Sequence, residues 1–587
     1  MKKIQTKWDL GLLYKGHDDP QIERDLAAVE AAFAAFEKKY RGATDYLEDD
    51  EKLAKALADS EALLDQPIEK PMYYFHFALD LNSEDAVTRA RQAQIRERLT
   101  KAQQRIKFFD LALGSMPLAR QKQVLKSPLL RRYRYFLQVL FSKAKHQLSE
   151  AEEKVISLKS APSYHLWTAL TDKLVSAQTV EFQGRQIPIA EASGKIADLP
   201  TAERRELHDR VVSALEKLAP VAESEVNAVV TDKKVEDELR GYQEPFDETI
   251  LHYENDRASV MALVRSVEGR YDISRRFYQL KARLMRLPRL EYADRNAGIG
   301  ENVRKVSFDE AVEIVRGAFS QAHPRYREIF DSYLRNGQID VYPNKGKTGG
   351  AYCASGTNIP TFVLLNYTDS LDQVSTLAHE MGHAIHGELS EAQPPLYQDY
   401  STSTAEVAST FFEGMVFDSV YEKLSDEEKV VALHTKISDD IQTVFRQVAC
   451  FNFEVDLHKG IREKGALSKE EIRALMNRHM SAYMGEAVRL REIDGNIFVS
   501  WHHIRSFFYV YTYAYGQLIS KALYAEYKKD KSFIDKVNQF LSAGGSDTPE
   551  NIFKSIGIDV TKPDFWEKGL QSIEKDIERL EKLTKNR

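Results

Sequence analysis

The chain has 587 residues, more than a single compact hydrophobic core accommodates, so we expect two or more lobes. Apolar residues make up 43% and charged residues 29%, and no basic patch accompanies the net charge of -7, which argues against a nucleic-acid partner. Only two cysteines are present, Cys353 and Cys450, so a disulfide-stabilised scaffold is excluded and a reducing compartment is expected.

The start of the sequence has no pattern typical of a targeting segment. Residues 1–19 begin with basic side chains but lack the apolar run of a signal peptide. No stretch approaches the roughly 20 consecutive apolar residues that a membrane span needs. We therefore expect a cytoplasmic protein without a membrane partner.

The first third of the chain predicts long amphipathic helices. Residues 20–160 are rich in Ala, Leu, Lys, Glu and Arg at helical spacing, without clean heptads or a repeat of fixed period. A short hairpin is expected from Thr179, turning at Gly184, after which helices resume. We expect residues 1–190 to form an N-terminal helical lobe and residues 191–587 to form a second domain.

The composition changes most between residues 338 and 367. Four glycines lie there among short apolar runs: Gly346, Gly349, Gly350 and Gly356. This pattern predicts two or three strands joined by a mobile glycine loop. The predicted architecture is mainly α, with one small sheet beside the helix that follows.

That following segment, TLAHEMGHAIHGEL at residues 376–389, carries a chemically informative pattern. Apolar residues recur at the spacing of one helix face, at Val374, Leu377, Ala378, Met381 and Ile385, which predicts a helix near 370–389 with a cap at Asp369 or Ser370.

His379 and His383 lie one turn apart on the opposite face of this predicted helix, where their two imidazoles can bind a single zinc ion. Glu380 is on an adjacent face, from which it can act on a water molecule. The alternative is a polar helix face that carries histidines by chance.

A catalytic zinc site usually has three protein ligands, so a third ligand is needed. The extended HExxHxxGxxH pattern fails, because His386 occupies its glycine position and Leu389 its last histidine position. His386 is too close to His383 on the same helix to complete the site. We interpret His386 as a core residue or as one that supports the ligands.

A carboxylate from the next predicted helix is the other option. Glu406 lies on that helix, beyond a turn at Pro394 and Pro395. It has an alternative role, because Ser403-x-x-Glu406 matches a capping box in which the acid only satisfies the helix end. Spacing leaves both roles open. Glu413, two turns further on, is either the ligand or a residue that orients a histidine.

Together these segments resemble the oligoendopeptidase F family of zinc metallopeptidases, relatives of thimet oligopeptidase. The resemblance rests on YTDSLDQVSTLAHEMGHAIH and YQDYSTSTAEVASTFFE. It extends over nearly the whole chain through KWDLGLLY, LSEAEEKVISLKS, DELRGYQEPFDETIL and HIRSFFYVYTYAYGQL.

The resemblance implies that one zinc ion is bound by His379, His383 and Glu406. It further implies that Glu380 is the catalytic base and that Glu413 supports the site.

The resemblance also implies an elongated, two-lobed, mainly helical fold around a deep central cavity. Residues 191–587 would then form the catalytic zinc peptidase domain, and oligopeptides would be the substrates.

A distal segment contains four closely spaced tyrosines: Tyr509, Tyr511, Tyr513 and Tyr515. On a helix, alternate tyrosines share a face, and aromatic packing explains at least one pair. The resemblance implies that His503 and nearby tyrosines contact the substrate carbonyl, where they could hydrogen-bond a developing oxyanion. We assign His503, Tyr509 and Tyr513, with Tyr511 as a further candidate. A contribution from His502 stays open.

The predicted activity is hydrolysis of internal bonds in short, unstructured peptides. The glycine loop at 346–356 and the strand Thr361–Tyr367 could pair with the substrate backbone as an added strand, giving broad specificity. Three rivals are a zinc carboxypeptidase, a catalytically silent peptide-binding protein that retains its metal, and a purely structural helical scaffold. The intact Glu380 argues against the silent protein.

Overall fold

The computed structural model describes residues 4–300 and 304–585 and is mainly helical, with three small sheets in these ranges. The chain divides into two compact units. Unit 1 combines Met1–Lys145, Arg304–Val420 and Glu526–Gly557, and unit 2 combines His146–Val303, Tyr421–Ala525 and Ile558–Arg587. The boundary expected at residue 190 would divide the chain into two consecutive segments. Each of the two units combines three segments that are separate in the sequence, so the two divisions differ.

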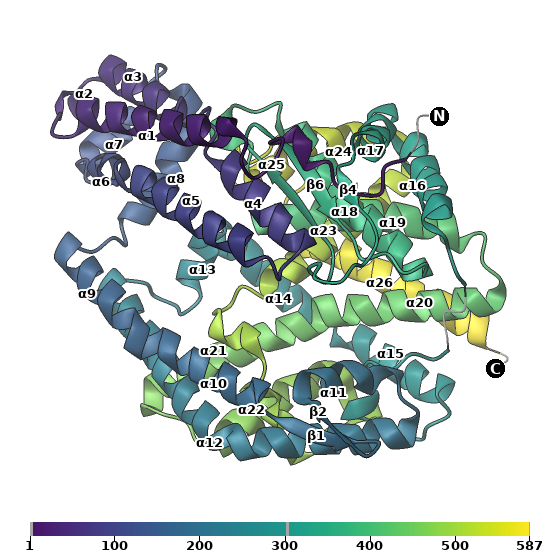
Figure 1. Cartoon of the computed structure of the whole chain (residues 1–587). Helices are drawn as coiled ribbons and strands as arrows, with labels where there is room; N and C mark the ends of the chain where they lie inside the picture. Colours follow the sequence, from purple (N-terminus) through teal and green to yellow (C-terminus); the bar gives the residue numbers. More distant parts are fainter. Residues whose placement is uncertain (1–3, 301–303, 586–587) are drawn as a thin grey trace. The chain divides into compact units, whose positions relative to one another are not determined.

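Unit 1 begins with eight helices that account for the amphipathic pattern of the first segment (Figure 1). They are α1 (Pro20–Tyr40), α2 (Asp45–Glu48), α3 (Asp50–Glu61), α4 (Glu69–Leu81), α5 (Ala86–Gln104), α6 (Lys107–Gly114), α7 (Leu118–Val124) and α8 (Arg134–Ala144). The rest of unit 1 contributes α16 (Phe308–Ala322), α17 (Pro324–Asn336), α18 (Leu371–Ser390), α19 (Thr402–Tyr421), α24 (Ile534–Leu541) and α25 (Pro549–Ser555).

A three-stranded sheet in unit 1 confirms the strands predicted between residues 338 and 367. Its order is β4 (Ile339–Asp340), β6 (Ile359–Leu364) and β5 (Tyr352–Gly356), so β6 is central and β5 lies at an edge. Strand β6 runs parallel to β4 and antiparallel to β5. Helix α18 packs against β5 and β6 (Figure 1), which confirms the expected small sheet beside this helix.

The beginning of the chain is built into the core of unit 1 next to this sheet. The indole nitrogen of Trp8 donates a hydrogen bond of 2.8 Å to the carbonyl of Val363 in β6. The Trp8 ring also meets the Phe362 ring edge-on, with the centroids 5.7 Å apart. Because a buried tryptophan needs a partner for its N–H, this contact fixes the N-terminal segment against the central strand.

The glycine-rich loop before β5 is tied to the rest of unit 1 at two neighbouring residues. The ammonium group of Lys347 is buried and lies 2.7 Å from a carboxylate oxygen of Asp340 in β4. The backbone N–H of Thr348 donates to the carbonyl of Asp80 at 2.7 Å. These contacts tie the loop to the rest of unit 1 at Lys347 and Thr348, and the mobility expected of its glycines stays a prediction.

Unit 2 is also mainly helical. Its helices are α9 (Glu150–Ser160), α10 (Leu166–Ser176), α11 (Ile189–Lys195), α12 (Thr201–Arg240), α13 (Asp247–His252), α14 (Arg257–Gly269), α15 (Tyr271–Leu284), α20 (Asp426–Asp440), α21 (Arg446–Lys464), α22 (Lys469–Met484), most of α23 (Tyr511–Lys529) and α26 (Pro563–Thr584). No helix in the described ranges combines the length and the apolar character that a membrane crossing requires.

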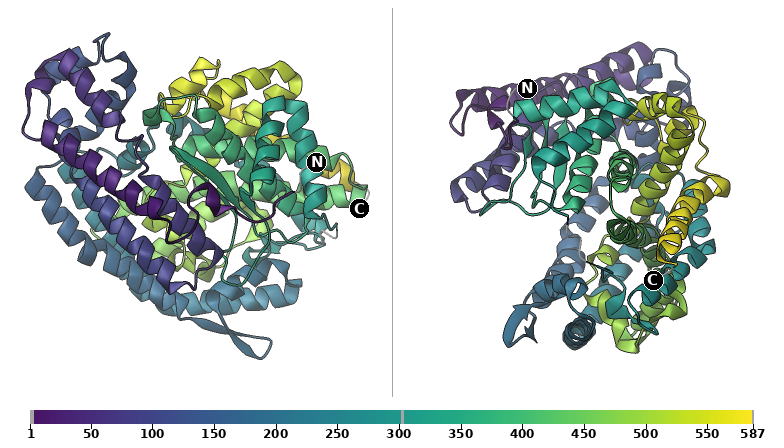
Figure 2. Two further views of the ribbon diagram at one scale, coloured as in Figure 1. Left: turned by 45° about the horizontal axis from the view of Figure 1, so that its top comes forward. Right: turned by 90° about the vertical axis from the view of Figure 1, so that its right-hand side faces the viewer.

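The predicted hairpin is present in unit 2, and it projects from the neighbouring helices in the left view of Figure 2. Strands β1 (Thr179–Phe182) and β2 (Arg185–Pro188) are antiparallel. The turn residues Gln183 and Gly184 have φ angles of 50° and 77°. Two successive left-handed residues give a turn whose twist matches that of the flanking strands.

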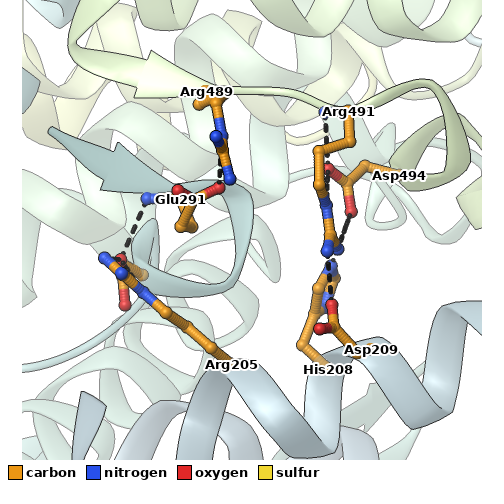
Figure 3. Close-up of polar contacts among 8 residues, drawn as sticks. Arg205, His208, Asp209, Glu291, Arg489, Arg491 and Asp494 are labelled. Atoms are coloured by element: carbon orange, nitrogen blue, oxygen red, sulfur yellow. Dashed lines mark hydrogen bonds and ion pairs between the residues drawn. The ribbon is translucent and has the colours of Figure 1, made fainter. Parts of the chain in front are cut away.

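Polar contacts join a second pair of strands in unit 2 and tie the segment after them to helix α12 (Figure 3). Strands β3 (Leu290–Glu291) and β7 (Val488–Arg489) run parallel, and Arg489 pairs with Glu291 at 2.9 Å. The next segment is held by Asp494, whose buried carboxylate lies 2.9 Å from both His208 of α12 and Arg491. The network therefore anchors the chain just before the segment that carries His503.

The segment carrying the clustered tyrosines differs from the predicted continuous helix. A short 3₁₀ helix covers His502–Arg505, and α23 begins only at Tyr511. Between them Phe507 and Phe508 have φ angles of 45° and 64°. Non-glycine residues seldom adopt this left-handed conformation, so the helix expected through Tyr509 is wrong at its start.

Candidate metal centre

Helix α18 carries the paired histidines, as the apolar spacing predicts. Its buried side chains include Val374, Leu377, Ala378, Met381 and Ile385. His379 and His383 lie one turn apart, with ring centroids separated by 5.0 Å, and both are half-buried. The fold of the helix therefore brings the two imidazoles together.

Helix α19 approaches α18 closely beside these histidines. A Cβ atom placed on Gly382 would lie 2.6 Å from the Cα of Ser409 and 3.1 Å from the carbonyl oxygen of Ala408. No side chain larger than hydrogen fits at this distance without moving a backbone. Gly382 thus permits the contact through which α19 delivers its acidic side chains.

Glu406 of α19 faces the two histidines. One carboxylate oxygen lies 3.6 Å from Nε2 of His379, and the other lies 3.9 Å from Nε2 of His383. One ligand atom from each of the three residues lies within 4.8 Å of the others.

The capping alternative for Glu406 finds no support in the contacts around it. Helix α19 begins at Thr402, and the Ser403 hydroxyl contacts the Ser401 hydroxyl at 2.9 Å. The Glu406 carboxylate accepts from the Ser409 hydroxyl at 3.3 Å, further along the same helix. This geometry favours the ligand role that spacing left open.

Glu413 contacts the other nitrogen of His379. Its carboxylate lies 3.2 Å from Nδ1, on the side of the ring opposite to the Nε2 that faces Glu406. An acceptor on one imidazole nitrogen fixes the ring orientation and leaves the other nitrogen for a metal. Glu413 therefore has the geometry of a residue that orients a ligand.

Glu380 is buried next to the histidines on α18, with 7% of its surface exposed. Burial, together with the charge of Glu406, raises the pKa of Glu380 to about 7. The His379 charge and a hydrogen bond with the Cys353 backbone oppose that rise. A carboxylate with a pKa near the working pH is well matched to proton transfer.

The two histidines differ in their proton affinity. Burial, with the charge of His379, lowers the pKa of His383 to about 3, so this ring is neutral. Burial also pulls down the pKa of His379, but hydrogen bonding and charge from Glu413 raise it overall to about 9. Because only a neutral imidazole ligates a metal, metal binding here would release a proton from His379.

The donor set fits zinc. Two imidazole nitrogens and one carboxylate oxygen are the ligands of a common class of catalytic zinc site, which leaves a fourth position for water. Their mutual separation of at most 4.8 Å is short enough for a single ion to contact all three after small rotations.

His386 is part of the core around α18. Its ring is fully buried and stacks on Tyr400, with centroids 3.6 Å apart. Within the described part of the chain neither ring nitrogen has a hydrogen-bond partner. His386 does not belong to the group that could hold a metal; its burial and stacking suit the core role, one of the two that we considered for it.

The distal residues form their own cluster in unit 2. Nδ1 of His503 and the Tyr509 hydroxyl are hydrogen-bonded, and the Tyr513 ring centroid lies 6.0 Å from His503 and 5.7 Å from Tyr509. All three are half-buried. Burial and the charges of Arg446 and His502 lower the pKa of His503, which keeps its ring neutral.

Two other candidates from this segment lie apart from the cluster. Tyr511 is fully buried and its hydroxyl donates to the Asn255 side chain at 2.9 Å, so we leave it out of the proposed substrate-contacting group. His502 is exposed and its Nδ1 lies 3.2 Å from Asp172.

The sheet corrects one expectation about substrate pairing. The segment Thr361–Tyr367 is not a free edge, because β6 is paired on both sides. The backbone N–H groups of Leu365 and Tyr367 donate to carbonyls of Asp340 and Val341, both at 2.8 Å. The edge strand is β5, within the glycine-rich stretch. The glycine loop at 346–356 therefore remains a candidate for pairing with a substrate, and Thr361–Tyr367 does not.

Sequence reasoning missed two residues that shape this site. The backbone of Cys353 in β5 bonds to Glu380, and Gly382 sets the approach of α19. A glycine inside HExxH is a signal for close helix packing that could have been noticed. The Cys353 contact depends on how the sheet pairs, which no local pattern reveals.

Comparison with known proteins gives the same assignment over most of the chain. The profile for peptidase family M3 matches residues 300–572, which include α18 and α19. The profile for oligopeptidase F matches residues 113–178. The chain belongs to peptidase family M3. It is therefore a metalloendopeptidase, a hydrolase acting on peptide bonds.

Several relatives of this family member align over nearly their full length. An oligoendopeptidase F homolog of Borreliella burgdorferi is 23% identical, with 98% of each chain covered. The group B oligopeptidase PepB of Streptococcus agalactiae is 24% identical over 97% of this chain and 98% of its own.

Solved structures share the fold. A chain from Chlamydophila abortus, described as a candidate peptidase, has a TM-score of 0.88 at 23% identity and covers 99% of this chain and 100% of its own. The oligoendopeptidase F of Enterococcus faecium has a TM-score of 0.70 at 18% identity, covering 97% and 99%. The mainly helical fold with small sheets is confirmed.

Adding a methyl group between the helices tests how the M3 site is assembled. We expect Gly382→Ala to cost about 1–3 kcal/mol of stability by overpacking, because α18 and α19 must move apart. Zinc affinity should fall by about 10-fold or more as Glu406 and Glu413 shift. Thermal unfolding and competitive zinc titration measure both effects.

Gly387→Ala is the matched control on the same helix. The added Cβ would meet the side chain of Ser355, at 3.1 Å from its Cβ, rather than a backbone atom, so a smaller effect on zinc is expected. Wild-type zinc affinity in Gly382→Ala would show that the close approach does not set the ligand geometry.

Proposed function

We propose that this M3 family member is a zinc-dependent oligopeptidase that hydrolyses internal bonds of short, unstructured peptides. The observation that carries the proposal is the group formed by His379, His383 and Glu406, with the buried Glu380 beside it. In this proposal the three ligands hold one zinc ion per chain. When bound, zinc would polarise the scissile carbonyl and make a water molecule more acidic.

Glu380 acts as the general base in this proposal. It accepts a proton from the attacking water and passes it to the amine that leaves. Its pKa near 7 leaves a large fraction of the carboxylate ready to accept at neutral pH, and makes the protonated form a competent acid afterwards. Glu413 keeps His379 in the orientation that ligation needs.

His503, Tyr509 and Tyr513 are proposed to contact the substrate carbonyl, with Tyr513 and one member of the hydrogen-bonded pair His503–Tyr509 donating to its oxygen as negative charge develops. Their support is the resemblance stated above and their clustering in unit 2, where a neutral imidazole and two phenols lie side by side. The buried Tyr511 has no part in this role.

Strand β5 is proposed to bind the peptide backbone. Its position at the sheet edge and the bond between its Cys353 backbone and Glu380 suit a substrate strand added beside the base. Main-chain pairing depends on the backbone of the peptide more than on its side chains, so broad specificity for peptide sequence follows. A substrate must then be extended over several residues.

The two cysteines are free, which suits a reducing compartment, and we propose a cytoplasmic location.

Substrate conformation tests the proposal. We expect a flexible peptide blocked at both ends to be cleaved at an internal bond. The same sequence displayed as a loop on a stable domain should be cleaved at least about 100-fold more slowly, because it cannot pair along β5 without unfolding. Mass spectrometry of the products and initial rates, with and without a zinc chelator, provide the measurement.

Equal rates on the loop and on the peptide would contradict the requirement for an extended substrate. Blocked ends separate the proposal from its nearest rival, since a carboxypeptidase needs a free C-terminus. Release of single residues from an unblocked peptide, without cleavage of the blocked one, would favour the carboxypeptidase.

A further inference from the structure

The segment between His503 and Tyr509 has an unusual backbone. Phe507 and Phe508 are consecutive non-glycine residues in the left-handed region, with φ angles of 45° and 64°. Such conformations persist only where surrounding contacts enforce them, and they gather at functional sites. The question is what holds this turn.

A buried acid on helix α21 contacts the turn directly. One carboxyl oxygen of Glu454 accepts the backbone N–H of Phe508 at 2.7 Å, and the other lies 3.9 Å from the sulfur of Cys450. Glu454 is fully buried, and among the described residues the influences on its carboxyl group are burial and the Phe508 N–H, with no cation beside it. A carboxyl group that is buried without a cation depends on hydrogen bonds for its stability, so the bond to Phe508 is a strong constraint on the turn.

Other contacts hold the same turn from further sides. The Thr249 hydroxyl donates to the carbonyl of Phe507 at 2.9 Å. The fully buried ring of His458, one turn beyond Glu454 on α21, packs on Phe508 with centroids 4.7 Å apart. These contacts position the two phenylalanines, but Glu454 supplies the hydrogen bond to the backbone of Phe508.

The chain before the turn is also fixed. Arg505 forms a buried ion pair with Glu225, at 2.7 and 3.0 Å, and donates to the carbonyl of Phe498 at 2.6 Å. The turn at Phe507 and Phe508 therefore connects the anchored segment that contains Arg505 to helix α23.

The reversed backbone has a clear geometric result. Instead of starting α23 early, the chain turns so that Tyr509 meets His503, with ring centroids 5.4 Å apart and a hydrogen bond between the hydroxyl and Nδ1. Tyr509 and Tyr513 then remain adjacent although only Tyr513 lies in the helix.

We propose that Glu454 is a positioning residue for peptide hydrolysis: its carboxyl group holds the Phe508 amide and thereby the left-handed turn that presents Tyr509 to His503. The proposal rests on the proposed role of Tyr509 toward the substrate. Glu454 itself does not touch the reacting atoms.

The chemistry required of Glu454 is hydrogen-bond acceptance, not charge. Burial raises the pKa of Glu454 to about 8, so the neutral acid predominates near pH 7. A glutamine has the same length and retains a carbonyl oxygen that can accept the Phe508 N–H. A leucine fills similar space but leaves this N–H unpaired.

The test compares these two substitutions on a blocked peptide. Glu454→Leu should lower kcat by about 10- to 100-fold, less than the 100- to 1,000-fold typical of deleting an oxyanion donor, with zinc content unchanged. Glu454→Gln should keep kcat within about threefold of wild type. Amide hydrogen exchange in a fragment that contains Phe508 should be faster in the leucine variant and unchanged in the glutamine variant.

Cys450→Ala is the matched control on the same helix. It removes the contact to the other carboxyl oxygen without altering the Phe508 hydrogen bond, so kcat should stay close to wild type. If the leucine variant does not fold, Glu454→Met, which is unbranched and similar in length, takes its place.

A double-mutant cycle with Tyr509→Phe separates the two levels of the proposal. If Glu454 acts through Tyr509, adding Glu454→Leu to Tyr509→Phe should cause little further loss. Loss of kcat in Tyr509→Phe with wild-type kcat in Glu454→Leu would overturn the role of Glu454 alone. Wild-type kcat in Tyr509→Phe would overturn the proposed role of Tyr509, and with it the positioning role. Equal loss in the glutamine and leucine variants would show that the acceptor oxygen is not what matters.

Discussion

Glu380→Gln is expected to lower kcat on a blocked peptide by about 100- to 10,000-fold, the loss typical of removing a general base. This corresponds to about 2.7–5.4 kcal/mol of transition-state free energy at 1.36 kcal/mol per tenfold change. The glutamine side chain has the same shape but cannot accept the proton of the attacking water. Zinc content should remain at one ion per chain, because Glu380 is not among the three residues that can hold the metal.

The fold should tolerate this change. Glu380 is buried, and burial raises its pKa to about 7. A neutral amide at this position avoids the free-energy cost of burying a charged carboxylate, so the substitution should not destabilise the fold. Glu388→Gln is the matched control, since it makes the same chemical change on the same helix. The Glu388 carboxylate accepts from the Tyr333 hydroxyl at 2.9 Å and is not among the residues that could hold the metal. Turnover close to wild type in Glu380→Gln would contradict the assignment of Glu380 as the general base.

Glu406→Ala is expected to weaken zinc binding by more than about 100-fold, beyond the 10- to 100-fold loss typical of residues that only support ligands. The reason is that its carboxylate faces both imidazoles, at 3.6 and 3.9 Å. Competitive titration against a chromophoric chelator at fixed pH gives the affinity. The pH must be fixed because zinc has to displace a proton from His379, whose pKa lies near 9.

Glu413→Ala provides the comparison that separates a ligand from its support. Its loss should fall within about 10- to 100-fold, because Glu413 contacts His379 through Nδ1 and not through the nitrogen that faces Glu406. If Glu413→Ala loses more zinc affinity than Glu406→Ala, the two roles are reversed. If Glu406→Ala keeps wild-type affinity and loses only about 1 kcal/mol of stability, Glu406 is a helix cap.

Local patterns predict the parts of this protein that depend on neighbours in the sequence. The helix with His379 and His383 follows from apolar spacing, because side chains three and four residues apart share a face. The β1–β2 hairpin follows from the turn at Gly184, because a short turn and the two strands that it joins are neighbours in the sequence. The resemblance to a known family adds what spacing cannot, namely a preference for Glu406 as the third ligand.

Features set by packing between distant segments were not predictable in this way. Gly382 signals a close contact but not which helix makes it, so the approach of α19 that orients Glu406 could not be predicted from the helix pattern alone. The role of Thr361–Tyr367 was misjudged because pairing with β4 makes β6 central. The helix start at Tyr511 was missed because Glu454, far away in sequence, holds the left-handed turn at Phe508.

Zinc titration of the metal-free protein, followed by cleavage of a doubly blocked peptide, tests the central claim most directly. Wild-type activity should be absent without metal, rise with added zinc and saturate at one ion per chain. Glu380→Gln, titrated in parallel, should take up the same one ion and stay at or below about 1% of the wild-type rate. Full activity of the metal-free protein, or a Glu380→Gln variant that cleaves the peptide at the wild-type rate, would contradict the account.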